Sequence, residues 1–175
     1  MSAKKSIADL VTHDGLHDSL TGLASLPAFM ESATREIALA IRERIPINLF
    51  LISLSKIRNV DGELIEINYG KELSSFTEED QYHLAAQLIH TAGFLQSEFR
   101  ESDLLSRYTL TEFLLMNKGE YEAIKNKLEN LGERGNLAIA GTKINFADTG
   151  NKDRDSRGIL LESISFLQKR MIKQN

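Results

Sequence analysis

The run of residues from Ile47 to Leu54, INLFLISL, constrains the fold more than any other part of the sequence. Nearly every residue in it is apolar, so it lacks the alternation of apolar and polar side chains found in a strand with one wet face. A strand that is covered on both faces has this pattern. We therefore predict that residues 47–54 form a strand at the centre of a sheet with helices on its faces.

The overall composition is that of one globular domain. The chain has 175 residues, of which 42% are hydrophobic and 26% charged, which is neither a disordered nor a fibrous composition. It contains no cysteine, so disulfides, thiolate zinc sites and cysteine nucleophiles are all excluded.

The charge and the hydropathy of the chain argue against nucleic-acid and membrane partners. The net charge of −4 argues against nonspecific binding to nucleic acid or to an acidic membrane surface. No uninterrupted apolar stretch exceeds the five residues from Ile37 to Ile41, which is far shorter than the roughly 20 residues of a membrane span, and Met1–Ile7 is not followed by the apolar region of a signal peptide. We expect a cytoplasmic protein with no nucleic-acid or membrane partner.

Four helices are predicted from caps and apolar spacing. Ser25 is positioned to cap the first helix, with Pro27 in its first turn, a face of Phe29, Ala33, Ile37 and Ile41, and a stop at Pro46. Thr77 and Asp80 resemble a capping box for a helix ending near Arg100. The third helix spans Glu120–Leu131 with Gly132 and Gly135 as stop signals, and the last runs from Asp155 or Ser156 to about Lys173.

Further strands are predicted between these helices. Leu104–Tyr108 and Glu112–Met116 are separated by three residues, which is short enough only for a hairpin, and Leu137–Ile144 is a further strand. Residues 56–76 contain the turn signal Asp61-Gly62, and we expect the segment that follows this turn to be a loop with a short helix. Another helical turn is expected at Ile7–Val11, and a polar loop at Gly150–Ser156. Helices alternating with strands favour an α/β or α+β sandwich.

Two motifs resemble those of GGDEF (diguanylate cyclase) domains. Asp18 to Leu23, followed by Phe29, resembles the opening D-x-L-T-G-L…F of that family. Arg100-Glu101-Ser102-Asp103, then five residues, then Thr109 to Phe113, resembles R-x-x-D-x₅-G-G-D-E-F. The resemblance implies a central, mostly antiparallel sheet flanked by helices, with a β-hairpin at the motif. It assigns residues 17–175 to the domain and residues 1–16 to a short leader.

The resemblance also implies a reaction whose residues have changed here. Active members are homodimers that join two GTP molecules into cyclic di-GMP with the help of two metal ions. The metal ions require acidic ligands. The hairpin tip requires glycines, because the nucleotide approaches the backbone closely there. The tip glycines align with Thr109 and Leu110, and an acidic ligand aligns with Thr111, so that Glu112 alone survives.

The other acidic positions and the base contacts have changed as well. The D-x-D metal ligands of the central strand align with Ser53 and Ser55. The guanine-binding asparagine aligns near Asp61, and the lysine of the last helix has no clean match near Gln168–Met171. We therefore predict a catalytically inactive domain without a bound metal or cofactor.

The R-x-x-D element is intact at Arg100 and Asp103, where the family binds its product away from the reaction centre. An arginine fork matches O6 and N7 of guanine, and a carboxylate accepts from N1–H and the exocyclic amine. Family members often supply a second arginine from the helix after the hairpin. In this sequence the helix carries Lys125 and Lys127 instead, and Lys127 is closer to the position of that arginine. The hypothesis is a cyclic di-GMP receptor that signals through an unidentified protein partner, with a ligand-bridged dimer as one mode.

Three other interpretations stay open. Taken alone, Arg100 and Asp103 are the ends of a solvated turn with an ion pair between them. In the second interpretation the domain is a nucleotide-independent interaction module that docks a partner through Tyr108–Phe113, with Leu110 as an exposed apolar anchor. In the third interpretation it is a GTP-binding regulatory domain that relies on Glu112. His83 and His90 share a helix face, for which a surface role is favoured over zinc.

Overall fold

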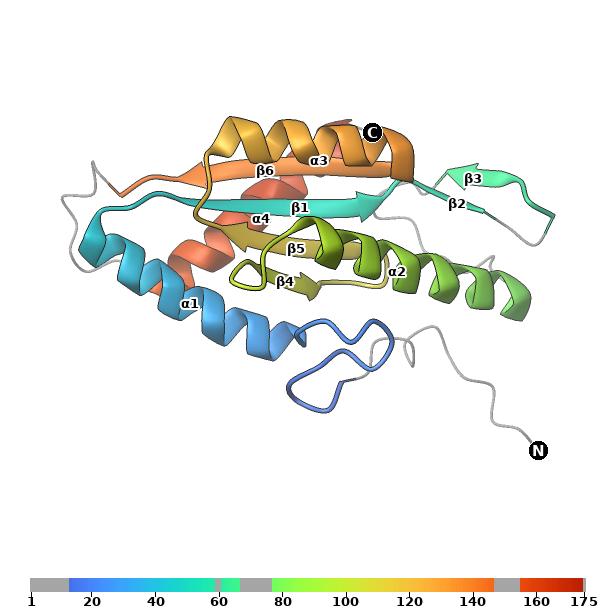
Figure 1. Cartoon of the computed structure of the whole chain (residues 1–175), viewed down its shortest axis with the longest axis horizontal. Coiled ribbons are helices and arrows are strands. Elements are labelled where there is room, and N and C mark those ends of the chain that lie inside the picture. Colours follow the sequence, from blue (N-terminus) through green and yellow to red (C-terminus); the bar gives the residue numbers. More distant parts are fainter. Residues whose placement is uncertain (1–12, 59–60, 67–76, 147–154, 175) are drawn as a thin grey trace.

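A four-stranded antiparallel sheet forms the centre of the computed structural model, which describes residues 13–58, 61–66, 77–146 and 155–174. The strands β4 (Leu104–Arg107), β5 (Glu112–Asn117), β1 (Ile47–Leu54) and β6 (Leu137–Ile144) lie in that order (Figure 1). Each neighbouring pair is antiparallel. Every residue of β1 is buried, so the predicted central strand is confirmed with its bounds.

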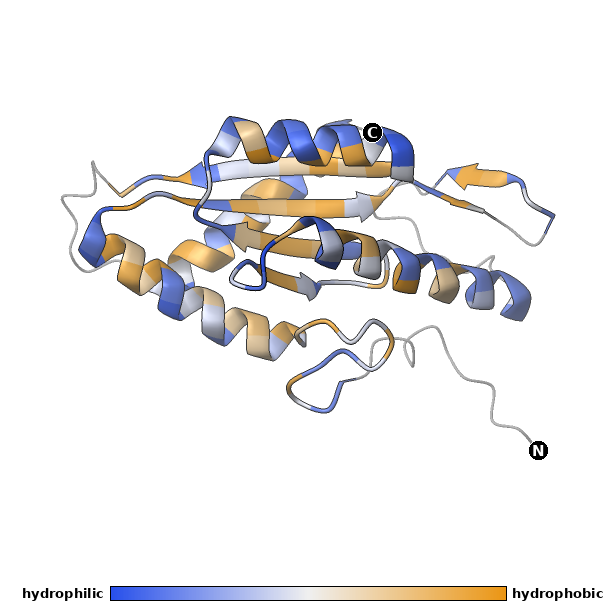
Figure 2. Cartoon of the chain, viewed as in Figure 1, coloured by the Kyte–Doolittle hydropathy of each residue, from blue (hydrophilic) through white to orange (hydrophobic). Residues whose placement is uncertain are grey.

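Helices cover both faces of this sheet. Helices α1 (Leu26–Glu43) and α4 (Ser156–Gln174) share one apolar cluster with Leu49 and Leu51, and α2 (Glu78–Glu98) and α3 (Tyr121–Gly135) share the other with Phe50 and Ile52. Successive side chains of a strand point to opposite faces, so β1 supplies both clusters. Its apolar colouring runs along nearly its whole length (Figure 2). The predicted α+β sandwich with a mostly antiparallel sheet is confirmed.

The predicted starts of two helices are confirmed at the level of atoms. The Ser25 hydroxyl accepts from the Ala28 N–H at 3.2 Å, and Pro27 lies in the first turn of α1. The Thr77 hydroxyl accepts from the Asp80 N–H at 3.1 Å, while the Asp80 carboxylate accepts from the Thr77 N–H at 2.9 Å. This reciprocal box satisfies two N–H groups that have no partner inside the helix.

The predicted stop of the first helix before Pro46 is confirmed, while the predicted end of the third helix is wrong. Helix α1 ends at Glu43, before the proline, because Arg44 adopts a left-handed conformation with φ 55° and its N–H bonds to the Ala40 carbonyl. Helix α3 continues through Gly132 and ends at Gly135, with the left-handed Asn136 as its C-cap. A Cβ at Gly132 would lie 2.8 Å from the Leu137 carbonyl oxygen, so this glycine permits close packing of α3 against β6 rather than stopping the helix.

The segment after β1 also differs from its prediction. Strands β2 (Lys56–Arg58) and β3 (Leu64–Glu66) pair as a separate two-stranded sheet, and β3 lies where we expected a loop and a short helix. The turn at Asp61-Gly62 is confirmed, and Gly62 has φ 83°. Strand β3 is exposed, so it carries no burial pattern by which the sequence would mark it.

Some predictions lie outside the described residues: the turn at Ile7–Val11, the part of the predicted loop after β3 from 67 to 76, and the polar loop at 150–154. Helix α4 begins at Ser156, and the Asp155 carboxylate accepts from the Arg157 N–H at 3.2 Å. Within the ranges that the structure describes, no helix is both long and apolar enough to cross a membrane.

Candidate functional site

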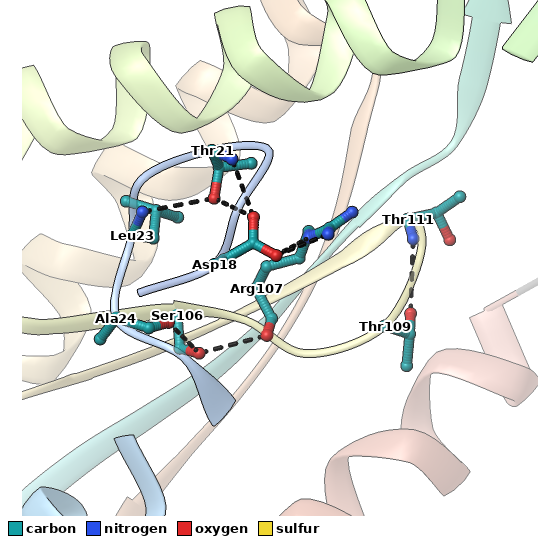
Figure 3. A network of polar contacts seen from close by, with 8 residues as sticks. All are labelled: Asp18, Thr21, Leu23, Ala24, Ser106, Arg107, Thr109 and Thr111. Carbon is teal, nitrogen blue, oxygen red and sulfur yellow. Dashed lines mark hydrogen bonds and ion pairs between the residues drawn. The ribbon is translucent and has the colours of Figure 1, made fainter. Parts of the chain in front are cut away.

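A buried ion pair holds the N-terminal loop against the sheet (Figure 3). The Arg107 guanidinium donates to one oxygen of Asp18 from Nε at 3.0 Å and from Nη2 at 2.5 Å. The other Asp18 oxygen accepts from the N–H and the hydroxyl of Thr21, at 2.8 and 2.6 Å. The side chains of Arg107 and Asp18 are 1% and 6% exposed. The loop is therefore fixed to the end of β4, immediately before the hairpin tip.

A second contact, between backbone and hydroxyl, strengthens this attachment. The Ser106 hydroxyl donates to the Ala24 carbonyl at 2.9 Å, beside the isolated bridge between these two residues (Figure 3). Sequence reasoning missed Arg107. The available signal was a charged side chain at the end of an otherwise apolar strand prediction, because such a charge is buried only when it is paired.

The hairpin tip is closed by its own residues. The N–H groups of Tyr108 and Thr109 both donate to the Glu112 carbonyl, at 2.7 and 3.3 Å. The Thr109 hydroxyl donates to the Glu112 carboxylate at 2.7 Å and accepts from the Thr111 N–H at 3.4 Å. Glu112 is only 5% exposed. Glu112 is thus a buried acceptor for the neighbouring threonine.

Ser53 and Ser55, which the sequence resemblance aligns with metal ligands, both donate to backbone carbonyls. Ser53 lies opposite Glu112 in the sheet register, and its hydroxyl donates to the Leu54 carbonyl at 3.3 Å. The Ser55 hydroxyl donates to the Asn136 carbonyl at 2.7 Å, at the C-cap of α3. Both protons are directed at backbone carbonyl oxygens. No group of three or more metal-ligating His, Cys, Asp or Glu side chains occurs in the described ranges.

Tyr108 connects the hairpin to the last helix. Gln168 of α4 donates an amide hydrogen to the Tyr108 hydroxyl at 2.9 Å. Burial raises the pKa of Tyr108 above its usual value of 10.0, and the negative charge of Glu112 raises it further. Leu110, at the tip, is half-buried and packs against the cluster beneath α2 and α3. It is therefore not the exposed anchor that the interaction-module interpretation assumes.

The Arg100–Asp103 turn follows α2 directly. The Arg100 N–H donates to the Asp103 carboxylate at 3.0 Å, and the Asp103 N–H donates to the Arg100 carbonyl at 2.9 Å. Arg100 is exposed and Asp103 half-buried. Among the described residues, the ion pairs of arginine and lysine do not join these two side chains. The expected ion pair of a solvated turn is therefore not formed, and the turn is closed through its backbone instead.

Two cavities flank this turn, and both are lined by Arg100 and Asp103. The first, of about 490 Å³, extends toward β5 and the start of α3, where Asn117, Lys118 and Glu120 line it. The second, of about 510 Å³, lies toward the N-terminal loop and is lined by Leu16, Leu23, Phe99 and Leu105 among others. Volumes of this size are in the range of small-molecule sites.

Lys127 lies near the turn but is engaged elsewhere. Its ammonium group donates to the Glu98 carbonyl, pairs with the Glu98 carboxylate at 3.3 Å and lies 4.9 Å from the centre of the Phe99 ring. It lines neither of the two cavities. Lys125 pairs with Glu129 on the same helix at 3.8 Å. Besides Arg100, the first cavity is lined by the cation Lys118, which is paired with Glu36 at 2.6 Å and which sequence reasoning missed.

Comparison with known proteins identifies the fold. No family model matches the sequence, and no curated protein does so. Among solved structures, a microbial GGDEF domain studied with cyclic di-GMP has a TM-score of 0.64 at 13% identity, covering 91% of this chain and 92% of its own. The DgcB GGDEF domain of Caulobacter crescentus, in complex with cyclic di-GMP, has a TM-score of 0.62 at 14% identity, covering 91% and 90%.

A third structure contains a protein partner. The diguanylate cyclase SiaD of Pseudomonas aeruginosa, in complex with its activator SiaC, has a TM-score of 0.64 at 15% identity. The match covers 91% of this chain and 58% of SiaD. These likenesses agree with the strand order and the helix layers described above. The chain therefore has the GGDEF domain fold.

Proposed function

We propose that this chain, from residue 17 to 175, is a catalytically inactive GGDEF-like domain that binds cyclic di-GMP and passes the signal to a partner protein. The observation that carries the proposal is the Arg100–Asp103 turn. It presents an exposed arginine beside a half-buried carboxylate, with no ion pair between them, at the junction of two cavities. Two of the similar GGDEF structures also concern cyclic di-GMP.

The chemistry of the turn suits guanine. The planar guanidinium of Arg100 can donate two parallel hydrogen bonds to O6 and N7, a pattern that adenine does not offer. One Asp103 oxygen is held by the Arg100 N–H, which fixes the carboxylate so that it can accept from N1–H or the exocyclic amine. Because the turn is closed by two hydrogen bonds from backbone N–H groups, one to a carbonyl and one to the Asp103 carboxylate, little ordering entropy is lost on binding.

Two features of the hairpin support the loss of catalysis. Phosphoryl transfer of this kind depends on metal ions held by oxygen ligands near the phosphates. Here Glu112 is buried against Thr109, and Ser55 is committed to the Asn136 carbonyl. The tip also carries the side chains of Thr109 and Leu110, at positions where the family resemblance expects glycines.

The output is proposed to be a protein contact in the cytoplasm. SiaD has an activator protein bound, so an interface with a partner is compatible with this fold. Cyclic di-GMP would favour whichever conformation or assembly it binds more tightly, including two copies joined by one ligand. The free turn is half-exposed, so the ligand bound there would itself form part of the surface that a partner meets.

Calorimetry with cyclic di-GMP tests the binding. The wild type should release heat and bind, while Arg100→Ala should lose roughly tenfold or more in affinity, since a good bidentate base contact discriminates by about 1–3 kcal/mol. Arg35→Ala is the matched control, because Arg35 is an exposed arginine paired with Glu31 on α1. Equal affinities for the wild type and Arg100→Ala contradict the site, and absence of heat from the wild type contradicts the receptor.

Two further measurements test the rest of the proposal. Purified protein incubated with GTP and Mg²⁺ should yield no cyclic di-GMP, and any product formed would contradict the inactive state. Capture of partners with and without cyclic di-GMP should differ in composition. The same partner bound equally in both conditions, with no ligand bound in calorimetry, would favour the nucleotide-independent interaction module instead.

A further inference from the structure

Two buried asparagines face each other beside the first cavity. Asn48 of β1 and Asn117 of β5 are register partners and are 1% and 5% exposed, between strands that are otherwise mostly apolar. The Asn48 amide nitrogen donates to the Asn117 amide oxygen at 3.0 Å and to the Gly119 carbonyl at 2.8 Å. A pair of amides buried in a sheet is costly unless its polar atoms are satisfied.

These contacts fix the orientation of the Asn117 amide. Asn48 uses its amide nitrogen for two acceptors, so the Asn117 oxygen, and not its nitrogen, must face Asn48. The Asn117 nitrogen therefore points away from Asn48. It has less than 1 Å² of exposed surface and no hydrogen-bond partner. Asn117 thus brings a buried donor without an acceptor to the wall of the 490 Å³ cavity.

The rest of the lining favours a planar, uncharged group over a phosphate. Leu104, Met116 and Ile124 supply apolar walls. The charged lining consists of three carboxylates (Glu36, Asp103 and Glu120) and two cations (Arg100 and Lys118), so its formal charge is negative. Negative charge repels a phosphate and leaves a neutral ring unaffected.

The start of α3 is likewise closed to an anion. A helix N-terminus binds phosphates through its N–H groups when these are free. Here the Glu120 carboxylate accepts from the Glu122 and Ala123 N–H groups, at 3.3 and 2.7 Å. The donors that a phosphate would use at this end of the cavity already serve a side chain of the protein.

We propose that this cavity holds the second guanine ring of the dinucleotide whose first guanine binds Arg100 and Asp103, and that Asn117 donates its unpartnered N–H to the acceptor edge of that ring. This inference rests on the proposed function. Guanine presents O6 and N7 as acceptors on one edge, which is what a donor-only amide requires. The Asn117 oxygen is occupied by Asn48, so the amide has only its donor to offer. The Asn117 nitrogen is covered in this structure, so the proposed contact requires it to become exposed as the ring binds.

Calorimetry of a matched pair of variants tests the inference. Asn117→Leu removes the donor, together with the oxygen that accepts from Asn48, and keeps a side chain of similar size, while Met116→Leu changes a wall of the same cavity without touching either group. We expect a loss of about tenfold in affinity for cyclic di-GMP with Asn117→Leu and wild-type affinity with Met116→Leu. Thermal unfolding of both variants checks that each is folded.

A second measurement uses the wild-type protein and does not depend on the variant folding. In ¹⁵N-labelled protein, the side-chain NH₂ signals of Asn117 should shift as cyclic di-GMP is added. Wild-type binding that depends on Arg100, with these signals unmoved or with Asn117→Leu binding as tightly as wild type, overturns the inference and leaves the proposed function standing. If wild type does not bind at all, both fail.

Discussion

Arg107 and Asp18 lie 89 positions apart in the chain and meet in a buried ion pair with a closest N–O distance of 2.5 Å. The pair connects the loop that precedes α1 to the strand that leads into the hairpin. The same Asp18 carboxylate also organises that loop by accepting from Thr21. One carboxylate therefore sets both the shape of the loop and its place on the sheet.

Removal of one partner of this pair should destabilise the fold strongly. Asp18→Ala leaves a buried guanidinium without its carboxylate, which costs about 3–5 kcal/mol in the free energy of unfolding. Denaturant unfolding measures this loss. Arg35→Ala is the control, because its ion pair with Glu31 is 70% and 74% exposed, and it should change stability by no more than ~1 kcal/mol. Similar losses for both variants would contradict a structural role for the buried pair.

Gly141 should tolerate no side chain. A Cβ there would lie 2.5 Å from a ring carbon of Phe50 and 2.9 Å from the Tyr121 hydroxyl, and these two rings are stacked with centroids 5.4 Å apart. Gly141→Ala should therefore cost about 1–3 kcal/mol through overpacking. Gly93→Ala is the matched control, because nothing lies within 4 Å of its Cβ position in α2, and it should stabilise by up to ~1 kcal/mol. Thermal unfolding of the two variants gives the comparison, and a neutral Gly141→Ala contradicts the packing.

Tyr108 should ionise at a higher pH than an ordinary tyrosine, and this should make the stability of the fold depend on pH in the alkaline range. Burial and the Glu112 charge raise its folded pKa above 10.0, while the unfolded chain ionises near pH 10. Between these two pKa values the folded state binds the extra proton, so stability falls as pH rises from about 10 through the folded pKa. Tyr108→Phe should lack this fall.

Ultraviolet titration of tyrosinate measures the ionisation directly. One of the four tyrosines should titrate last, and that step should vanish in Tyr108→Phe but persist in the variant with phenylalanine at Tyr82, a residue that is 79% exposed. A last step that survives Tyr108→Phe would contradict the environment described for this residue.

Lys127 should contribute less to ligand binding than Arg100. Its charge is already balanced by Glu98, and its ammonium group lines neither cavity. If the proposed receptor function holds, Lys127→Ala should reduce affinity for cyclic di-GMP by no more than about fivefold, and added salt should shrink the effect. Lys125→Ala, on the same helix and paired with Glu129, is the control. A loss as large as that of Arg100→Ala would assign Lys127 a direct phosphate contact.

Features encoded by neighbouring residues could be predicted well. The bounds of β1 and β6 and the Thr77–Asp80 box depend on runs or spacings within a few residues, and the structure confirms them. The glycines of α3 show where such local reasoning ends. Gly132 resembles a stop signal in sequence, but its role is set by the Leu137 carbonyl of the next strand. The hairpin of β2 and β3 was missed because three-residue strands with exposed side chains leave no periodic pattern.

In the candidate site, too, contacts between neighbouring residues could be predicted and contacts between distant residues could not. Arg100 and Asp103 are three positions apart, so a short motif identifies them, and their backbone hydrogen bonds form within one turn. The Asn48–Asn117 pair spans 69 positions and the Asp18–Arg107 pair 89. Contacts of that separation depend on the strand register and on the loop path, neither of which single-sequence patterns define.

The position of β1 in the sheet also has a consequence for biosynthesis. Both strands that pair with it, at residues 112–117 and 137–144, follow it in the chain. While the polypeptide is being made from its N-terminus, eight consecutive sheet-forming residues emerge long before either neighbour exists. During that interval the segment is an unpaired, aggregation-prone strand in the nascent chain. A product truncated before residue 112 would lack both partner strands, so chaperones would have to bind it or proteases degrade it.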